Sequence, residues 1–200
     1  MVLKQNTKHF LHRAAFGPSL SEKTDDVNIS SWIRNSGENR PIRAIEKPQL
    51  TPETINGSKE NIKIALSKSR DQLVQLNGSW ITQLADPTVA FREKMTLFWH
   101  DHFACRVRSA YLAQQQNNTL RKHALGNFRD LLFAISKDPG MLQFLNNQQN
   151  KKDSPNENFA REILELFTLG RGNYTEQDIR DSARAFTGWS FHPLTGEFVF

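Results

Sequence analysis

Apolar residues recur every three or four positions along most of this chain, which is the spacing of amphipathic helices. The longest run starts at Lys59 and predicts one long helix. Its apolar face carries Ile62, Leu66, Leu73, Leu76, Trp80 and Leu84. The same spacing predicts further helices that end near Arg106, lie within 119–136, and end near Asn147.

Capping residues mark where these helices start. Asp86-Pro87 and Asp138-Pro139 each supply an aspartate for the N-cap and a proline for the first helical position, where the missing N–H is not needed. Residues 154–157 predict a complete capping box for the next helix, which Gly170 ends. Residues 174–179 predict an N-cap threonine with a hydrophobic staple for the last helix.

The N-terminal part is less regular. We expect a short helix from about Leu3 to Ala15, stopped by Gly17-Pro18. Ser19 and Glu22 suggest a capping box before a second short helix. Residues 35–58 carry three prolines, which block regular helix, so this stretch is predicted to be a linker or a draped loop.

Residues 189–200 have the pattern of a strand, a turn and a strand. We therefore predict an all-α, multi-helix domain with a short C-terminal β-hairpin stub. Residues 1–58 would form the N-terminal helices and a Pro/Gly-rich linker, and residues 59–188 the helical core. A lone hairpin is marginal in water. We expect this hairpin to be truncated and completed by the rest of a longer chain or by a second protein subunit.

Composition excludes several classes of protein. The 200 residues are 38% hydrophobic, enough to build a core. The single cysteine, Cys105, excludes an internal disulfide and a cysteine-based zinc site. No apolar run is long enough for a membrane span. The net charge of +5 is spread along the chain without a basic block or a recognition motif, which argues against nucleic-acid binding.

The stretch 98–103 holds two histidines. The helical period places His102 on an apolar stripe with Phe91 and Phe98, and His100 on the opposite face with Glu93. His102 then fits a core histidine that donates to a carbonyl or a carboxylate. The alternative is that either histidine binds a metal or acts in acid–base chemistry.

Two further polar stripes are candidates for chemistry. His123 starts a stripe that continues through Asn127 and Asp130, either as a solvent-facing face or as a His–Asp pair. The start of the predicted 155–169 helix carries Asn156, Glu157, Asn158, Arg161 and Glu162. A helix N-terminus can hold an anion or orient a carboxylate, so we expect one of these side chains to reach His100, His102 or His123. Salt bridges to nearby arginines are the alternative for this stripe.

An amide-rich loop at 146–153 separates two predicted helices. It suits a self-bonded rigid turn, a contact for a sugar or another polar ligand, or a weak calcium site. The sequence contains no phosphate-binding loop, no dinucleotide fingerprint and no nucleophile elbow. It therefore identifies no cofactor and no metal.

Several long and uncommon motifs occur together. They are Phe10–Pro18, Arg92–Phe103, Leu120–Leu132, Asp138–Leu142, Pro155–Glu162, Glu165–Gly170, Gly172–Asp178 and Ala185–Trp189. These motifs resemble the bacterial family catalogued as domain of unknown function 1800. The resemblance implies a largely helical fold with no settled activity, in proteins usually more than twice this length. It also implies export, whereas the absence of a signal peptide at the N-terminus predicts a cytoplasmic protein.

Two functions follow as hypotheses. The first is a non-catalytic binding or scaffold protein, in which the histidines and the 156–165 helix buttress the core. The second is an enzyme-like, metal-assisted polar site built from His100, His102, His123 and the Asn156–Glu165 helix. The first is preferred, because each of these side chains has a credible structural role.

Overall fold

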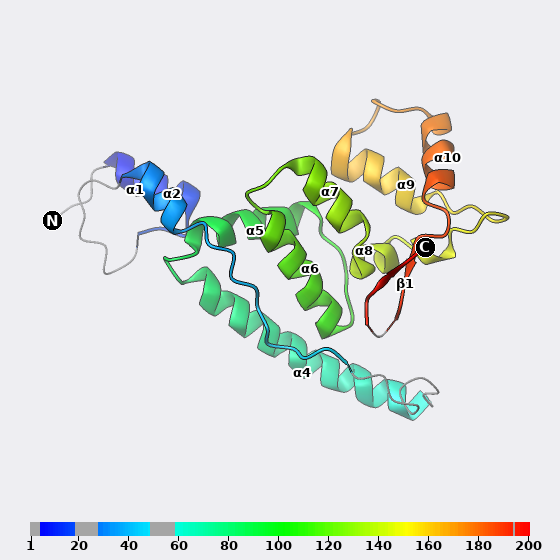
Figure 1. Cartoon of the computed structure of the whole chain (residues 1–200), viewed down its shortest axis with the longest axis horizontal. Helices are drawn as coiled ribbons and strands as arrows, with labels where there is room; N and C mark the ends of the chain where they lie inside the picture. The colour runs from blue at the N-terminus through cyan, green and yellow to red at the C-terminus, as the bar shows by residue number, and fades with distance from the viewer. Residues whose placement is uncertain (1–4, 19–27, 49–58, 194) are drawn as a thin grey trace.

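The structure is a computed structural model that describes residues 5–18, 28–48, 59–193 and 195–200 (Figure 1). Helices dominate it, and a two-stranded hairpin follows the last helix, which confirms the predicted all-α class. The elements are α1 (Gln5–Ala14), α2 (Ile29–Asn35), α4 (Lys59–Leu84), α5 (Ala90–His102), α6 (Ala110–His123), α7 (Phe128–Ser136), α8 (Pro139–Phe144), the 3-10 helix η1 (Asn147–Gln149), α9 (Asn158–Glu162), the π-helix η2 (Ile163–Thr168), α10 (Glu176–Ala185), β1 (Ser190–Phe191) and β2 (Phe198–Val199). No helix in these ranges is long and apolar enough to cross a membrane.

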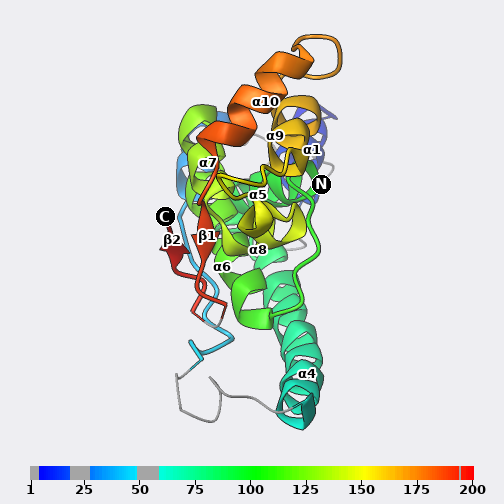
Figure 2. The ribbon, with the colours of Figure 1, turned by 90° about the vertical axis from the view of Figure 1, so that its right-hand side faces the viewer.

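The elements form an elongated arrangement rather than a ball. In Figure 1, α1 and α2 lie at one end, and α9, α10 and the hairpin lie at the other. The long helix α4 runs along one edge, and both α5 and α6 pack against it (Figures 1 and 2). The central helices α5 to α8 therefore connect the two ends.

The main core lies between α5 and η2. Its buried residues are Phe103, Leu120, Leu131, Ile135, Met141, Leu142, Leu145, Phe159, Ile163 and Phe167. Aromatic rings gather at its centre, where the ring of Phe103 lies 5.5 Å from Phe167 and 6.4 Å from Phe128. Burial of such large apolar side chains is the main force that holds these short helices together.

Two predicted helix boundaries were wrong around α5. Asp86 does not cap the helix: its Oδ1 accepts from the backbone N–H of Thr88 and closes a tight turn. The helix begins four residues later, at Ala90. It ends at His102 rather than near Arg106, and the N–H of Phe103 donates to the Trp99 carbonyl as the last helical bond.

The helix predicted within 119–136 is two helices. α6 starts at Ala110, nine residues before the predicted segment, and ends at His123. α7 begins at Phe128, because the side chain of Asn127 accepts from the Arg129 N–H as an N-cap. The predicted stripe of His123, Asn127 and Asp130 is therefore broken.

The capping box predicted at 154–157 is absent. Ser154 instead exchanges two backbone hydrogen bonds with Lys151 and closes a turn. The helix α9 begins at Asn158, whose N–H donates to the side chain of Asn156. The local signal was strong, but the loop's own hydrogen bonds take up the residues that would have formed the first turn.

Other start and stop signals are confirmed. Asp138 caps α8, because its side chain accepts from two backbone N–H groups of the first turn. Thr175 and Asp178 form a reciprocal capping box on α10. Gly170 lies at a positive φ of 78° after η2, as a terminating glycine requires. The predicted box of Ser19 and Glu22 lies outside the described residues, and α2 is capped by Asn28.

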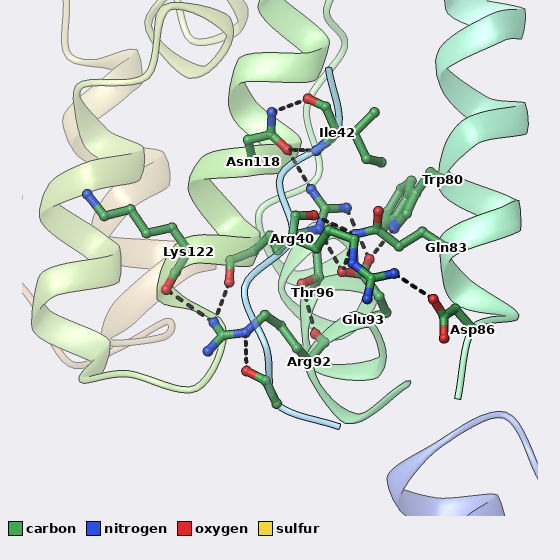
Figure 3. A network of polar contacts seen from close by, with 12 residues as sticks. Arg40, Ile42, Trp80, Gln83, Asp86, Arg92, Glu93, Thr96, Asn118 and Lys122 are labelled. Carbon is green, nitrogen blue, oxygen red and sulfur yellow. Dashed lines mark hydrogen bonds and ion pairs between the residues drawn. The ribbon is translucent and has the colours of Figure 1, made fainter. Parts of the chain in front are cut away.

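A buried ion pair joins α5 to α6 (Figure 3). Glu93 and Arg121 are both fully buried and form a bidentate pair, with Nε–Oε1 at 2.6 Å and Nη2–Oε2 at 3.0 Å. Glu93 also accepts from Trp80 and Gln83 of α4. One carboxylate therefore connects three helices, and its lone pairs are well satisfied.

Candidate functional site

A surface pocket of about 350 Å³ lies where the loop after α8 meets the turn after α10. We call it the loop pocket. Its walls come from two stretches of chain, one within the loop that follows α8 and one in the turn that follows α10. The lining residues are Gln148, Asn150, Lys151, Lys152, Thr187, Gly188, Trp189 and Ser190. This volume is at the small end of the range for sites that bind small molecules.

Asn150 builds the floor of the loop pocket. Its side-chain amide donates to the carbonyl of Ala183 at 2.7 Å and accepts from the N–H of Asn156 at 3.0 Å. The backbone carbonyl of Asn150 accepts from the N–H of Gly188. The amide therefore fastens the loop to the end of α10, where helix carbonyls lack intrahelical partners.

Asn147 makes a second fastening. It is almost fully buried, and its amide nitrogen donates to the carbonyls of Phe186 and Trp189 at 3.1 and 3.0 Å. The Phe186 carbonyl also accepts from the N–H of Trp189, and the Ala183 carbonyl also accepts from the hydroxyl of Thr187, so the asparagines add to bonds that the turn after α10 already makes. The amide-rich loop is therefore the self-bonded rigid turn that the sequence allowed, and it holds the two walls of the pocket in place.

The rim of the loop pocket is cationic. The paired backbone bonds between Lys151 and Ser154 close a turn that leaves Lys151 and Lys152 exposed. Neither ammonium group forms an ion pair with any residue that the structure describes. The lining contains no carboxylate, so the charged side chains that line the pocket are two lysines.

Trp189 supplies the aromatic wall. Its ring packs edge-on against Phe186 and Phe198, with centroids 5.1 and 5.3 Å away, and Lys137 lies over it. These contacts fix the ring in one orientation. A ligand with an apolar part gains contact area there without ordering the indole.

Among the residues that line the pocket, Gln148 carries a buried polar atom without a described partner. Its Oε1 is buried and has no hydrogen-bond partner among the described residues. A buried oxygen of this kind costs free energy unless a ligand or a water satisfies it. The Oε1 of Gln148 is therefore free to accept a hydrogen bond from a donor group of a molecule in the loop pocket.

None of the three predicted histidines lines this pocket, and His100 and His102 contact neighbouring helices instead. His102 is half-buried, and its Nε2 lies 3.1 Å from the carbonyl of Phe167 in η2. The predicted hydrogen bond to a carbonyl is confirmed. The predicted stripe was wrong, because the inward face of α5 carries Glu93 and Thr96 while Phe98 is 56% exposed.

His100 and His123 occupy different surroundings. The ring of His100 packs edge-on against Trp80 at 5.0 Å, and its Nδ1 is buried without a described partner. Burial lowers the pKa of His100, which favours the neutral ring. His123 ends α6, and burial together with the nearby Lys122 lowers its pKa.

The predicted polar cluster at the start of α9 forms only within itself and with its neighbours. Asn158 donates to the carbonyl of Leu145, and Arg161 pairs with Glu176 at 2.9 Å and with Glu157 at 3.4 Å. Glu162 forms no hydrogen bond or ion pair with a described histidine. Among the described residues, no side-chain hydrogen bond joins the cluster to His100, His102 or His123. Binding of a ligand by these residues stays a prediction.

A metal site would need several ligating side chains in one place. In the described ranges, no group of three or more histidine, cysteine or carboxylate side chains comes together to hold a metal ion. The buried thiol of Cys105 has a pKa raised to about 11 by desolvation, so it is protonated near neutral pH. His100, His102 and His123 do not come together as such a group in the described ranges.

The family model for the protein of unknown function DUF1800 matches residues 9–200. The chain belongs to the DUF1800 family. A search of curated proteins returned no match, and neither did a search of solved structures. The family confirms the resemblance of the motifs, and it leaves the activity of this DUF1800 chain to be argued from its own geometry.

The pocket residues were only partly visible in the sequence of this DUF1800 chain. The amide-rich loop stood out by composition, and Trp189 stood out within a family motif. Nothing in the sequence joined them, because the pocket depends on side-chain amides that bond to carbonyls more than thirty residues later in the chain. Apart from their charge, nothing in the sequence indicated that Lys151 and Lys152 lie at a pocket.

Proposed function

We propose that this DUF1800 chain is a non-catalytic binding protein that holds a small anionic ligand in the loop pocket. The observation that carries the proposal is the pairing of a rigid, amide-fastened wall with two exposed lysines and no lining carboxylate. Preformed walls reduce the entropic cost of binding, because fewer groups have to become ordered. Lysine ammonium groups bind carboxylates and phosphates as point charges.

The surroundings of the pocket define the ligand further. Trp189 offers a fixed apolar surface, and Gln148 offers an acceptor oxygen that has no partner among the described residues, so a hydroxyl or other donor on the ligand would be favoured there. The ligand would therefore combine a carboxylate or phosphate group with a short apolar or planar body. A pocket of about 350 Å³ limits it to a small molecule.

Binding is preferred to catalysis because of where the titratable groups lie. His100 and His102 pack against aromatic rings of α4, α5 and η2, and His123 does not line the pocket. The loop pocket itself is lined by amides, hydroxyls, lysines and one indole. This set recognises and orients a ligand, but it contains no nucleophile activated by a neighbouring base.

Isothermal titration calorimetry with phenyl phosphate, benzoate and neutral benzyl alcohol tests this proposal. We expect the two anions to bind and benzyl alcohol not to bind. Lys151→Gln/Lys152→Gln should weaken anion binding by about tenfold or more, since each tenfold step needs only about 1.4 kcal/mol. Lys68→Gln/Lys122→Gln removes the same charge from exposed positions elsewhere and should bind as wild type.

The salt dependence provides a second readout. Raising NaCl from about 50 mM to about 500 mM should weaken binding, because exposed charges are screened over a few ångströms at high ionic strength. Absence of heat with both anions would contradict the proposal. So would equal binding by the two double variants.

A further inference from the structure

Residues 37–48, which we call the strap, run as an extended trace with a bend at Ile45 and contact α4 and α6, whose facing sides we call the groove (Figure 1). We propose that this groove is a binding site for extended peptides, which the strap occupies in cis. A segment of another protein with the same pattern of charge and apolar side chains would displace it. The site is separate from the loop pocket and does not depend on the proposed anion binding.

Two side-chain amides of α6 bind the backbone of the strap. Asn118 accepts from the N–H of Ile42 at 2.9 Å and donates to its carbonyl at 2.7 Å (Figure 3). Gln114, one helical turn earlier, does the same for Ile45, with both distances at 2.8 Å. Each amide therefore replaces a neighbouring β-strand and satisfies both polar groups of one strap residue.

The two residues whose backbone is bound also anchor the strap by their side chains. Ile42 and Ile45 are each 5% exposed, and they pack in one cluster with Leu76 of α4 and Ala110 of α6. An extended chain would turn residues three apart to opposite sides, but the strap bends at Ile45, and both side chains lie in this cluster. Burial of two such side chains is worth several kcal/mol in total at about 1.5–3 kcal/mol each.

The ends of the groove are acidic. Arg40 of the strap pairs with Asp86 at 2.6 Å, and Lys47 pairs with Glu197 of the hairpin at 2.8 Å. The Arg40 carbonyl also accepts from Gln83 of α4. The groove therefore contacts a basic residue at each end of this stretch and two apolar residues between them. Counted from Arg40 as position one, the apolar residues are at positions three and six, and the second basic residue is at position eight.

Gln114 and Asn118 bind the main chain of the strap rather than its side chains. A segment with a different sequence could therefore make the same hydrogen bonds. The amides of Gln114 and Asn118 would bind any backbone in the same extended form. Pro41 favours that form, because proline fixes its own φ and pushes Arg40 away from helical geometry. A foreign segment with these features can make every contact that the strap makes.

Fluorescence anisotropy with a labelled synthetic peptide of residues 37–48 tests the inference on the full chain. The variant Ile42→Ala/Ile45→Ala weakens the strap in cis and should bind the peptide at least about tenfold more tightly than wild type, because cis competition is reduced. Adding Gln114→Leu/Asn118→Leu should abolish binding. A peptide N-methylated at Ile42 and Ile45 should also fail, since it lacks the two N–H groups.

Three results would overturn the inference. They are absence of peptide binding to a variant that still melts cooperatively, equal binding of the N-methylated peptide, and a strap-exchanged dimer of the wild type in analytical ultracentrifugation. The last result would assign the groove to a second copy of the chain.

If the alanine variant does not fold, hydrogen exchange of the wild type decides. We expect the amides of Ile42 and Ile45 to exchange faster than the core of α6, and exchange only at the global unfolding rate would contradict release of the strap.

Discussion

Glu93 is bound by donors from two helices. It accepts from Arg121 of α6 and from Trp80 and Gln83 of α4, and both charged partners are fully buried. Taking two charges out of water is costly, and their pairing with extra hydrogen bonds offsets that cost. Removal of one partner leaves the other charge buried and unpaired, so this pair should be the most sensitive polar contact described here.

Glu93→Gln should destabilise the fold by about 3–5 kcal/mol, because Arg121 would lose its counter-charge within the core. Glu176→Gln is the matched control, since Glu176 pairs with Arg161 at the surface and is largely exposed. That change should alter stability very little. Urea denaturation of the three proteins measures the difference, and similar midpoints for both variants would refute the role of the buried pair.

Asp138 is a second buried acid, and it makes stability depend on pH. Desolvation raises its pKa to about 7, although the N–H groups of Gly140 and Met141 and the amide of Gln116 act in the opposite direction. The folded state thus holds a proton more tightly than the unfolded chain. Its contribution to stability is complete at acid pH and is lost as pH rises from about 4 to about 7.

Asp138→Asn keeps an N-cap acceptor but removes this titration. Between about pH 5 and pH 8, the unfolding free energy of the wild type should fall relative to that of the variant. The steepest slope is about 1.4 kcal/mol per pH unit. Chemical denaturation at both pH values measures it, and parallel pH profiles would show that Asp138 stays ionised throughout.

Helix boundaries show where local sequence decides structure and where it does not. The caps at Asp138 and Thr175 were predictable, because their partners lie within three residues. The Ser154 cap failed, because Lys151 takes its backbone groups. The buried face of α5 was also predicted wrongly. Periodicity places the polar Glu93 toward solvent, and only the distant Arg121 makes burial of its carboxylate favourable.

Two helical glycines should respond in opposite ways to alanine. A Cβ on Gly78 of α4 would meet no atom within 4 Å, so Gly78→Ala should stabilise the protein by about 1 kcal/mol. A Cβ on Gly140 of α8 would lie 2.6 Å from the Val107 side chain and 3.0 Å from Asp138. Gly140→Ala should destabilise by about 1–3 kcal/mol through overpacking. Thermal unfolding compares the two, and the same sign for both would contradict these packing contacts.

The molecule as a whole joins segments that are far apart in sequence through side-chain amides. Gln114 and Asn118 hold the strap, and Asn147 and Asn150 hold the turn after α10. Composition alone flagged the second set and missed the first. The helical class and most elements follow from periodicity, whereas the loop pocket and the contacts of the strap depend on residues far apart in sequence, which no local pattern encodes.

The central claim is that the loop pocket takes a small anion, and amide chemical-shift mapping tests it most directly. Titration of the ¹⁵N-labelled wild type with phenyl phosphate should shift the amide signals of 148–152 and 187–190, while those of α4 and α5 stay in place. Lys151→Gln/Lys152→Gln should remove the shifts. Shifts centred on His100, His102 and the start of α9 instead, or no localised shifts, would contradict the account.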